Sequence, residues 1–249
     1  MSNVSISTNK LTIGYSHQPS AISVQTDLSF SLYAGEMVCM LGPNGCGKST
    51  LLRTLAGLQP ALSGAFSIRS SAFTPEKAVA LVLTERMSME NTTVHDVVSM
   101  GRYPYTSFLG GLTAADEAII TESLEAVGFG SVETVASTMF NAHSDGEKQR
   151  ILIAKALAQQ TPIILLDEPT AHLDLPHRIL ILRLLRRLAH EQGKTVLIST
   201  HELDLALALS DRIMLMTPNK GIQLDTAEAL KKADAFTSAF GMDIFNPFG

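Results

Sequence analysis

The chain of 249 residues has a formal net charge of -5 at pH 7, with 45% hydrophobic and 17% charged residues. This composition supports a sizeable core and excludes global disorder, and without a dense Lys/Arg stripe we expect no direct binding to nucleic acid. Two cysteines, Cys39 and Cys46, are too few for a disulfide framework and fit a reducing, cytosolic setting. The sequence shows neither the ~18 consecutive apolar residues of a membrane span nor a signal peptide, so we expect a partner to hold it at any membrane.

Two stretches in the first third of the chain are predicted to form strands. Residues 4–35 and 64–83 carry alternating or short apolar runs, which favours strands packed beside the sheet of the phosphate-binding loop described next. In LTIGYS (11–16) this places Tyr15 on a strand, where its ring could stack on an adenine base. Tyr15 fits equally well as a packing residue, so its position alone does not assign it a ligand.

The segment EMVCMLGPNGCGKSTLLRTLAGL reads as a buried strand over 37–41, a glycine-rich loop and a helix. The loop has the spacing of a P-loop, with Gly42, four further residues, then Gly47, Lys48 and Ser49. Glycines let successive N–H groups face phosphate oxygens, and the helix adds the positive end of its dipole. Lys48 reaches the terminal phosphates, and Ser49 can ligate Mg²⁺ through its hydroxyl. We assign the binding of a nucleoside triphosphate to Gly42, Pro43, Asn44, Gly45, Cys46, Gly47, Lys48, Ser49 and Thr50.

Cys46 lies inside this loop, at the N-terminal end of the helix that follows. That location is expected to lower the pKa of the thiol, because the helix dipole stabilises the thiolate. The alternative is that Cys46 is a small residue that the loop tolerates and that has no chemical role.

Between about residues 86 and 156 the apolar pattern becomes helical. TTVHDVVSMG and TAADEAIITESLEAVG fit helices, the second with Thr113 as its N-cap, Asp116 in its first turn and Gly128 after its end. This helical segment separates the phosphate-binding loop from an acidic motif further along the chain.

The helical segment contains HSDGEKQR (143–150), just before the apolar run ILIAKALAQ. Ser144 and Glu147 have the spacing of a capping box, in which the serine caps the helix and the glutamate closes the box. The same stretch could be an altered form of a motif that grips the last phosphate of a nucleotide. The two interpretations are compatible, because a serine that caps a helix can also meet a phosphate that a partner brings to it.

Two buried strands end on polar groups that suit nucleotide chemistry. In TPIILLDEPTAHLD the apolar run over 163–166 reads as a central parallel strand, and Asp167 and Glu168 follow at its carboxyl end, where open α/β sheets bind ligands. Asp167 suits a Mg²⁺ site, and Glu168 can act as general base toward an attacking water. A third strand over 194–200 ends at His201, which could hydrogen-bond a γ-phosphate or that water, although a lone histidine is usually structural.

The C-terminal part continues the alternation of helices and strands. LPHRILILRLLRRLAHEQG begins with Pro176 near its first turn and stops at Gly193, as expected of a helix that faces the core. RIMLM (212–216) predicts a further strand. The tail over 231–249 is either a small helix packed on the core or the start of a longer C-terminal region.

The phosphate-binding loop, HSDGEKQR, LLDEPTAHLD and STH follow one another in the order seen in the ATP-binding subunit of ABC transporters, which the sequence resembles over about residues 4–230. Within that superfamily, GRYPYTSFLGGLTAADE (101–117) and DEPTAHLDLPHR (167–178) are similar to importers of metal chelates, meaning iron-siderophore, haem or vitamin B12. The resemblance implies an α/β fold with a P-loop NTPase (RecA-like) core, an N-terminal antiparallel β subdomain and an inserted α-helical subdomain. It implies a single ABC ATPase domain over 1–249, with its core at 1–85 and 157–230, its helical subdomain at about 86–156 and a short tail at 231–249.

The resemblance also implies ATP and Mg²⁺ as cofactors and assigns roles to matching residues. Tyr15 matches the aromatic residue that stacks on adenine, and Lys48, Glu168 and His201 match the catalytic groups. The expected Mg²⁺ ligands are Ser49, Asp167 and Glu85. Such subunits work as head-to-tail pairs, so the ATP of the partner subunit is assigned to Ser144, Asp145, Gly146 and Glu147.

The sequence departs from the family pattern at two places. The usual signature LSGGQ is replaced by HSDGE (143–147), which puts Asp145 where a glycine stands and an anion should approach. Repulsion at that range could cost a few kcal/mol at an effective dielectric constant near 20, unless Lys148 or Arg150 offsets it or Asp145 points away. Glu85 aligns with a glutamine that helps to hold Mg²⁺, and the added charge is expected to tighten that binding, unless Glu85 is a solvated surface residue.

The resemblance predicts an ATPase that powers uptake of a metal chelate through a membrane permease. Its expected partners are a second copy of itself, transmembrane permease subunits and, indirectly, a substrate-binding protein, with no nucleic acid. The expected location is the cytoplasmic face of the inner or plasma membrane, through the permease, which with its binding protein would select the cargo. The alternatives are a soluble ABC-type ATPase without a permease and a weakly hydrolysing nucleotide-binding adaptor.

Overall fold

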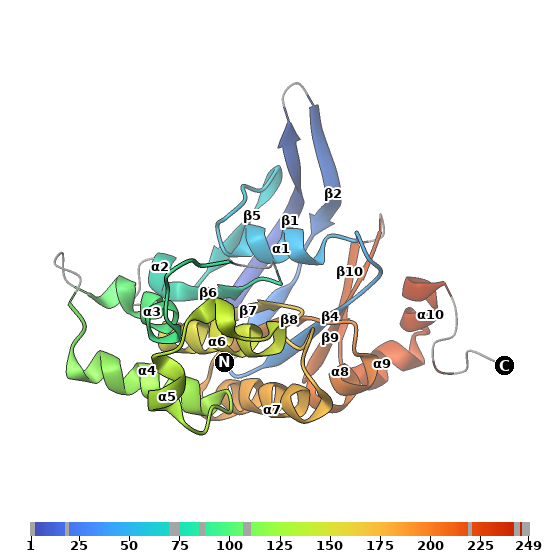
Figure 1. The fold of residues 1–249 in the computed structure, drawn as a ribbon. Coiled ribbons are helices and arrows are strands. Elements are labelled where there is room, and N and C mark those ends of the chain that lie inside the picture. Colours follow the sequence, from blue (N-terminus) through green and yellow to red (C-terminus); the bar gives the residue numbers. More distant parts are fainter. Residues whose placement is uncertain are drawn as a thin grey trace.

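The computed structural model describes residues 3–17, 20–69, 75–84, 88–106, 111–218, 221–241 and 245. The strands of these residues form two sheets, and the helices lie around the larger one (Figure 1). The expected α/β architecture is therefore confirmed, with strands and helices alternating in the second half of the chain.

The larger sheet has six described strands in the order β10-β9-β4-β8-β7-β6, all parallel except β9 with β10. These strands are β4 (Met37–Leu41), β6 (Val79–Val82), β7 (Ile163–Asp167), β8 (Thr195–Ser199), β9 (Arg212–Thr217) and β10 (Gly221–Asp225). β4, β7 and β8 are buried along their whole length, which explains their continuous apolar runs. Because these three strands are parallel neighbours, the residues that follow them meet at one edge of the sheet.

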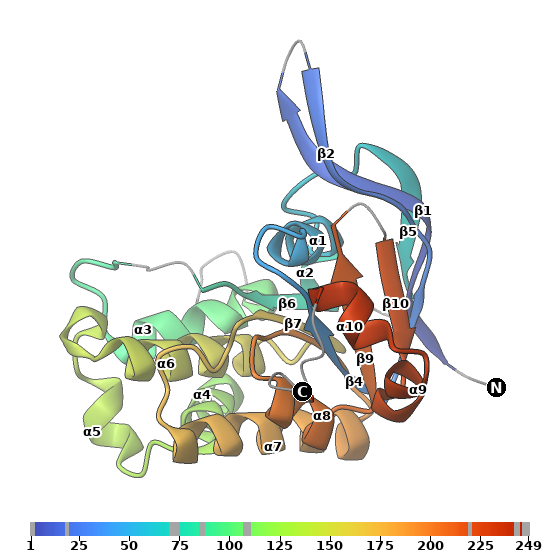
Figure 2. The same ribbon diagram turned by 90° about the vertical axis from the view of Figure 1, so that its right-hand side faces the viewer.

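The smaller sheet is antiparallel and comes from the N-terminal part of the chain. Its strands are β1 (Val4–His17), β2 (Ser20–Leu28), β3 (Ser31–Tyr33) and β5 (Ser63–Ile68), and β1 pairs with the other three. The β1–β2 hairpin projects away from the rest of the molecule in both views (Figure 2). The N-terminal antiparallel sheet expected from the sequence is confirmed, whereas β6, predicted to lie beside the sheet of the phosphate-binding loop, is a strand of that sheet itself.

Alternate residues of β4 face two different layers of the core. Met37, Cys39 and Leu41 belong to a cluster with the helical part of the chain, whereas Val38 and Met40 belong to a cluster with α1 (Lys48–Leu55) and the antiparallel sheet. The larger sheet is thus covered on one face by α1 and the small sheet, and on the other by helices that include α7 (Leu175–Gln192). In this sandwich the residues that follow the parallel strands lie at one edge of the sheet, where α/β sheets bind ligands.

The helices between β6 and β7 gather on one side of the sheet, at the left of Figure 1. They are α3 (Val94–Ser99), the 3-10 helix η1 (Met100–Tyr105), α4 (Ala114–Ala126), α5 (Val132–Ala136), the 3-10 turn η2 (Phe140–Ala142) and α6 (Asp145–Ala158), while the short α2 (Pro75–Ala78) precedes β6. The predicted cap of α4 is confirmed, since Thr113 and Asp116 form a capping box and Gly128 has a φ of 92°. The domain limits expected from the resemblance remain predictions.

The C-terminal elements complete the face covered by helices. Pro176 lies in the first turn of α7 and Gly193 ends the helix with a φ of 66°, as the sequence predicted, and Asp174, which was not predicted as a cap, caps it. Beyond α8 (Leu203–Leu209) and the last two strands, the chain forms α9 (Ala227–Lys232) and α10 (Ala235–Phe240). Phe236 of α10 is buried, so the first part of the tail packs on the core. None of the described helices is both long enough and apolar enough to cross a bilayer.

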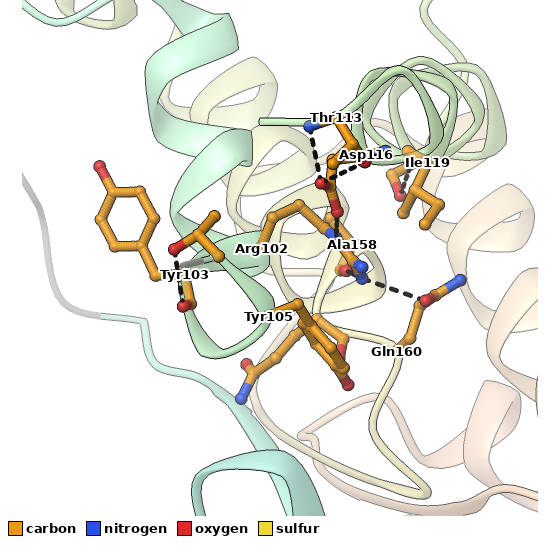
Figure 3. Close-up of polar contacts among 11 residues, drawn as sticks. Arg102, Tyr103, Tyr105, Thr113, Asp116, Ile119, Ala158 and Gln160 are labelled. Atoms are coloured by element: carbon orange, nitrogen blue, oxygen red, sulfur yellow. Dashed lines mark hydrogen bonds and ion pairs between the residues drawn. The ribbon is translucent and has the colours of Figure 1, made fainter. Parts of the chain in front are cut away.

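A buried arginine ties η1 to the ends of two longer helices (Figure 3). Arg102 donates from Nε to Asp116 Oδ1 at 2.8 Å, and from Nη1 to the Ala158 carbonyl at 2.8 Å and to Gln160 Oε1 at 3.0 Å. Its guanidinium also lies 4.1 Å from the centre of the Tyr105 ring. The start of α4 and the end of α6 are therefore joined through one side chain.

Asp116 belongs both to this cluster and to the capping box of α4. Hydrogen bonds from the Thr113 hydroxyl and N–H, and then from Arg102, lower the pKa of its carboxyl to about 2. Because the pKa in the folded protein is below the ordinary value, the ionised carboxyl stabilises the fold above about pH 4. That contribution is lost as the pH falls toward 2.

Replacing Arg102 with methionine is expected to lower the free energy of unfolding by about 3 kcal/mol, because the Asp116 carboxylate loses its charged partner and keeps only the bonds from Thr113. Urea unfolding followed by circular dichroism measures the change. Arg186→Met is the matched control, since Arg186 is exposed on α7, and it is expected to shift the free energy by less than about 0.5 kcal/mol. Equal stability of the two variants would show that the Arg102 cluster does not stabilise the fold.

Candidate functional site

The loop between β4 and α1 has the backbone of a phosphate cradle. Gly47 precedes α1 with a φ of 104°, a conformation that side chains rarely adopt, and a Cβ there would lie 2.8 Å from Val24 Cγ1. A Cβ at Gly42 would collide with the Met216 carbonyl oxygen. Both glycines are therefore required by close packing of this loop against β2 and β9.

Lys48 is folded over the same loop. Its Nζ donates to the Gly42 carbonyl at 2.8 Å and to the Pro43 carbonyl at 3.1 Å, and the residue is buried. The ammonium is thus held at the loop by two carbonyl groups, where it gives the loop a positive charge. The arrangement suits the terminal phosphates of a nucleotide.

Tyr15 lies at the rim of this loop. It projects from β1, is 41% exposed, and its hydroxyl lies 3.2 Å from Thr50 Oγ1 in α1. Tyr15 is therefore tied to α1, the helix that begins at Lys48, while part of its surface stays open to solvent. This placement is compatible with stacking on a base, which stays a prediction.

Cys46 does not have the lowered thiol pKa that its position in the sequence predicted. The residue is 1% exposed, and burial raises the pKa of its thiol although the nearby Lys48 acts in the opposite direction. Its side chain packs into the apolar cluster with α1 and the antiparallel sheet. The prediction failed because desolvation of the thiolate outweighs the helix dipole.

Cys46 is accordingly expected to react with a maleimide at least about tenfold more slowly in the folded protein than in urea. The reaction requires a thiolate, and the Cys46 thiol is both buried and raised in pKa. Mass spectrometry of the labelled peptide gives the two rates. Fast labelling of the native protein at neutral pH would contradict the burial of this thiol.

Asp167 and two hydroxyls form a polar group at the end of β7. Asp167 pairs with Ser199 of β8 in the sheet, and Ser199 Oγ donates to Asp167 Oδ1 at 2.5 Å. Thr84, just after β6, donates to the Asp167 carbonyl at 3.2 Å. The bond from Ser199 orients the buried carboxylate, and the bond from Thr84 holds the main chain of Asp167.

Glu168 and His201 face each other across the same edge of the sheet. His201 Nε2 lies 2.5 Å from Glu168 Oε1, with about half of the histidine side chain and a third of the glutamate side chain exposed. Glu168 has a φ of 45°, and its N–H is directed at Ser199, whose carbonyl lies 3.0 Å away. A side chain in this conformation costs of order 1 kcal/mol, so the neighbouring strands must hold it there. The result is a carboxylate, paired with an imidazole, at the edge where a ligand can enter.

A cavity of about 210 Å³ connects two of these groups. It borders both Gly42 and His201, and Phe240 of α10 forms another part of its wall. The first glycine of the phosphate-binding loop and the histidine after β8 therefore share one open space, as expected if both serve the same ligand.

Ser144 caps α6 as the sequence predicted. Its hydroxyl accepts from the Glu147 N–H at 3.3 Å, while Glu147 Oε2 accepts from the Ser144 N–H at 3.0 Å and from its hydroxyl at 2.8 Å. These bonds, from the Ser144 N–H first, lower the pKa of the Glu147 carboxyl. Asp145 is exposed in the first turn of α6.

Gly146 lets α6 approach the segment that follows β7. A Cβ at this position would lie 2.8 Å from the His172 carbonyl oxygen and 3.4 Å from Leu173 Cδ2. Asp174, the residue after Leu173, caps α7, and its Oδ1 lies 2.5 Å from His177 Nδ1. The start of α6, on the helical side, is thus packed against the chain that carries Glu168.

Comparison with known proteins shows the family of this chain. The family model described as ABC transporter matches residues 25–171, more than half of the chain. The chain belongs to the ABC transporter family. The resemblance inferred from the motifs is therefore confirmed, and the chain is an ATP-binding, ATP-hydrolysing member of that family.

In sequence, this ABC protein is similar to ATP-binding proteins of import systems. It is 36% identical over 245 residues to the iron(3+)-hydroxamate import ATP-binding protein FhuC of Bacillus subtilis, a match that covers 96% of this chain and 88% of FhuC. It is 39% identical over 192 residues to the hemin import ATP-binding protein HmuV of Streptomyces coelicolor, covering 74% of this chain and 65% of HmuV.

Solved structures of ABC proteins share the fold. An ABC transporter described as of the metal-chelate type, in an inward-facing conformation, matches with a TM-score of 0.82 and 28% identity, over 96% of this chain and 90% of that chain. The dimeric structure of the ABC transporter cassette MJ0796 matches with a TM-score of 0.77 and 25% identity, over 89% of this chain and 98% of that chain. ABC cassettes of this fold therefore form dimers.

Several residues of this ABC site were not found from the sequence. Ser199 orients Asp167, and Gln25 donates from Nε2 to the Cys46 carbonyl and to the Thr217 carbonyl, both at 2.9 Å. Arg178 lies 3.2 Å from Glu202, the residue after His201. Ser199 could have been found, because it ends a buried strand predicted to lie at the same edge, whereas the Gln25 contacts carry no local signal. Glu85, predicted as a Mg²⁺ ligand, lies outside the described residues.

Proposed function

We propose that this chain is the ATPase subunit of an importer that carries a metal chelate, such as an iron-siderophore, haem or vitamin B12, through a membrane permease. The main support is the similarity to FhuC of Bacillus subtilis, which extends over 96% of this chain. The similarity to HmuV and to a metal-chelate type transporter agrees with the same class of cargo. The proposed location is the cytoplasmic face of the inner or plasma membrane, where the permease would hold the subunit.

In this proposal the phosphate chain of ATP lies in the loop from Gly42 to Thr50. Lys48 leaves its two carbonyl partners, Gly42 and Pro43, to bind the terminal phosphates, since a charge-assisted bond to phosphate is stronger than a bond to a neutral carbonyl. Tyr15 offers the exposed part of its ring to the adenine. Its hydroxyl contact with Thr50 keeps that ring near the loop.

The site also fits Mg²⁺ held jointly with phosphate oxygens. Within the described ranges no group of three His, Cys, Asp or Glu side chains could hold a metal ion alone. Mg²⁺ in nucleotide sites uses one or two protein oxygens together with phosphates and water, so Ser49 and Asp167 suffice, with Glu85 as a proposed third ligand. When bound, the ion stabilises negative charge on the phosphates.

Glu168 and His201 are the proposed catalytic pair. Glu168 accepts a proton from the attacking water. His201 contacts the Glu168 carboxylate and hydrogen-bonds the γ-phosphate, and so positions the two relative to each other. Their 2.5 Å contact keeps the glutamate at the edge of the sheet where the water must arrive. This pair favours hydrolysis over the alternative of a non-hydrolysing adaptor.

Two copies are proposed to close head to tail around two ATP molecules. In that arrangement Ser144, Asp145, Gly146 and Glu147 of one copy meet the ATP bound by the loop of the other. The dimeric ABC cassette of the same fold supports this arrangement. The cap on α6 leaves the serine at a helix N-terminus, an end that attracts phosphate.

The cargo and the permease can be identified together. We expect a transmembrane permease to co-purify with the tagged subunit when it is extracted from its native membrane in mild detergent. Addition of iron-siderophore, haem or vitamin B12, each with the matching binding protein, should then show which cargo raises the ATPase rate of the complex. Recovery of the subunit from the soluble fraction alone, with no membrane partner under any cross-linking condition, would instead favour the soluble ABC-type ATPase.

A further inference from the structure

The segment between α5 and α6 carries a histidine where the family signature has an apolar residue. His143 precedes Ser144, and its side chain is only 11% exposed. Its ring lies edge-on to Phe129, with the ring centres 6.5 Å apart and the planes at 74°. A polar ring in such surroundings needs a partner for each nitrogen.

Thr138 determines which ring nitrogen of His143 carries a hydrogen. Its hydroxyl donates its one hydrogen to the Val135 carbonyl at 2.6 Å, so it can only accept from His143 Nε2, which lies 2.7 Å away. The Thr138 main chain is fixed as well, because its carbonyl accepts from the Val94 N–H at the start of α3 at 2.9 Å. Nε2 of His143 therefore carries a hydrogen and points at an anchored acceptor.

The other nitrogen faces the capping box of α6. His143 Nδ1 lies 3.6 Å from Glu147 Oε2, the oxygen that also accepts from the Ser144 hydroxyl and N–H. A neutral ring with its hydrogen on Nε2 would direct a lone pair at this carboxylate, whereas a protonated ring directs an N–H at it. The protonated form of His143 satisfies both Thr138 and Glu147.

We propose that His143 is a positioning residue for the signature serine and acts in its protonated form. The imidazolium adds to the positive charge of Arg150 beside the Glu147 carboxylate, so that a phosphate approaching the Ser144 hydroxyl meets less negative charge. The inference rests on the proposed function, because it takes Ser144 as the group that meets the ATP of the partner subunit. The positive ring also offsets the charge of Asp145, which would otherwise weaken the attraction of the helix end for an anion.

Glu147 of α6 is the charged group paired with His143, and Arg150 of α6 interacts both with Glu147 and with Asp174, the cap of α7. Glu147 and Asp145 are negative, and Arg150 is the positive group that interacts with Glu147. Arg150 Nη1 donates to the Val127 and Gly128 carbonyls, and its guanidinium lies 4.3 Å from the centre of the Phe129 ring. Thr138 and Phe129, which pack against the ring from the preceding elements, carry no charge. Because Lys148 and Arg150 balance Asp145 and Glu147, protonation of His143 changes the net charge at the start of α6 from near zero to near +1.

The test measures how ATP-driven association depends on pH. Glu168→Gln, which is expected to trap the ATP-bound dimer, is compared with Glu168→Gln/His143→Gln by sedimentation in MgATP between about pH 6 and about pH 8.5. With His143 present, association should weaken about fivefold as the pH rises through the range in which imidazoles lose their proton. With His143→Gln, which keeps a donor for Thr138 but carries no charge, this component of the pH dependence should disappear.

His95 provides a matched control, since its Nε2 lies 2.8 Å from Glu117 Oε2 on the surface of α3 and α4. Glu168→Gln/His95→Gln should keep the pH profile of Glu168→Gln. An identical profile with and without His143 would overturn the proposal. If Glu168→Gln fails to associate at any pH, the proposed function is contradicted. The imidazole ¹⁵N signals of His143 in the free subunit then test whether the ring is protonated. Two protonated nitrogens on His143 at about pH 6.5 support the proposal, and an unprotonated Nδ1 overturns it.

Discussion

Replacing Glu168 with glutamine is expected to lower the rate of ATP hydrolysis by about 10²- to 10⁴-fold while leaving ATP binding intact. The carboxylate lies 2.5 Å from His201 Nε2, and the glutamate N–H is directed at Ser199, so an amide can take the same place without changing the backbone. The amide cannot accept the proton that the attacking water must lose. Phosphate release under saturating MgATP measures the rate, and a fluorescent ATP analogue measures binding.

Glu191→Gln is the matched control for this substitution, because Glu191 is exposed on α7. It should hydrolyse ATP at the parent rate. Hydrolysis at the parent rate by Glu168→Gln as well would show that another group, or water alone, accepts the proton, and the assignment of Glu168 as general base would be wrong.

Removal of the Lys48 ammonium is expected to weaken ATP binding by about 10²-fold and to abolish measurable turnover. A buried positive group aimed at phosphate oxygens contributes about 3 kcal/mol in comparable sites, which corresponds to that factor. In Lys48→Met the apolar part of the side chain is kept, so the loss reports on the charge. Isothermal titration with ATP and Mg²⁺ measures the affinity.

Two controls separate this effect from damage to the fold. Lys232→Met removes an exposed ammonium at the end of α9 and should leave ATP affinity unchanged. Thermal unfolding of Lys48→Met without nucleotide reports on the bonds that Lys48 makes to Gly42 and Pro43. ATP affinity equal to that of the parent, in a folded Lys48→Met protein, would exclude the loop from the phosphate site.

The sequence predicted those parts of the fold and site whose signals are local. The run Met37–Leu41 is apolar at every position, and it forms a strand buried on both faces. The caps of α4 and α6 were predicted because Thr113 and Ser144 each stand just before a helical pattern, whereas the cap of α7 at Asp174 was not predicted. The position of Glu168 and His201 at one edge followed from the rule that parallel strands gather their carboxyl ends.

Features that depend on burial or on distant pairing were not predictable. Cys46 stands at a helix N-terminus, which lowers a thiol pKa, yet packing around it buries the thiol and raises the pKa. Tertiary packing determines whether desolvation or the helix dipole has the larger effect on the thiol pKa, and that packing cannot be read from the sequence. The contact of His143 with Thr138 likewise depends on how the chain between α5 and α6 turns back on itself.

Sedimentation equilibrium of Glu168→Gln, with and without MgATP, tests the central claim that two copies close around ATP. The account predicts that the mass rises from 26.8 kDa toward twice that value with MgATP, with two ATP molecules retained per dimer. MgADP, which lacks the γ-phosphate that Ser144 is proposed to meet, should leave the protein monomeric. A mass that stays at 26.8 kDa in saturating MgATP would contradict the account.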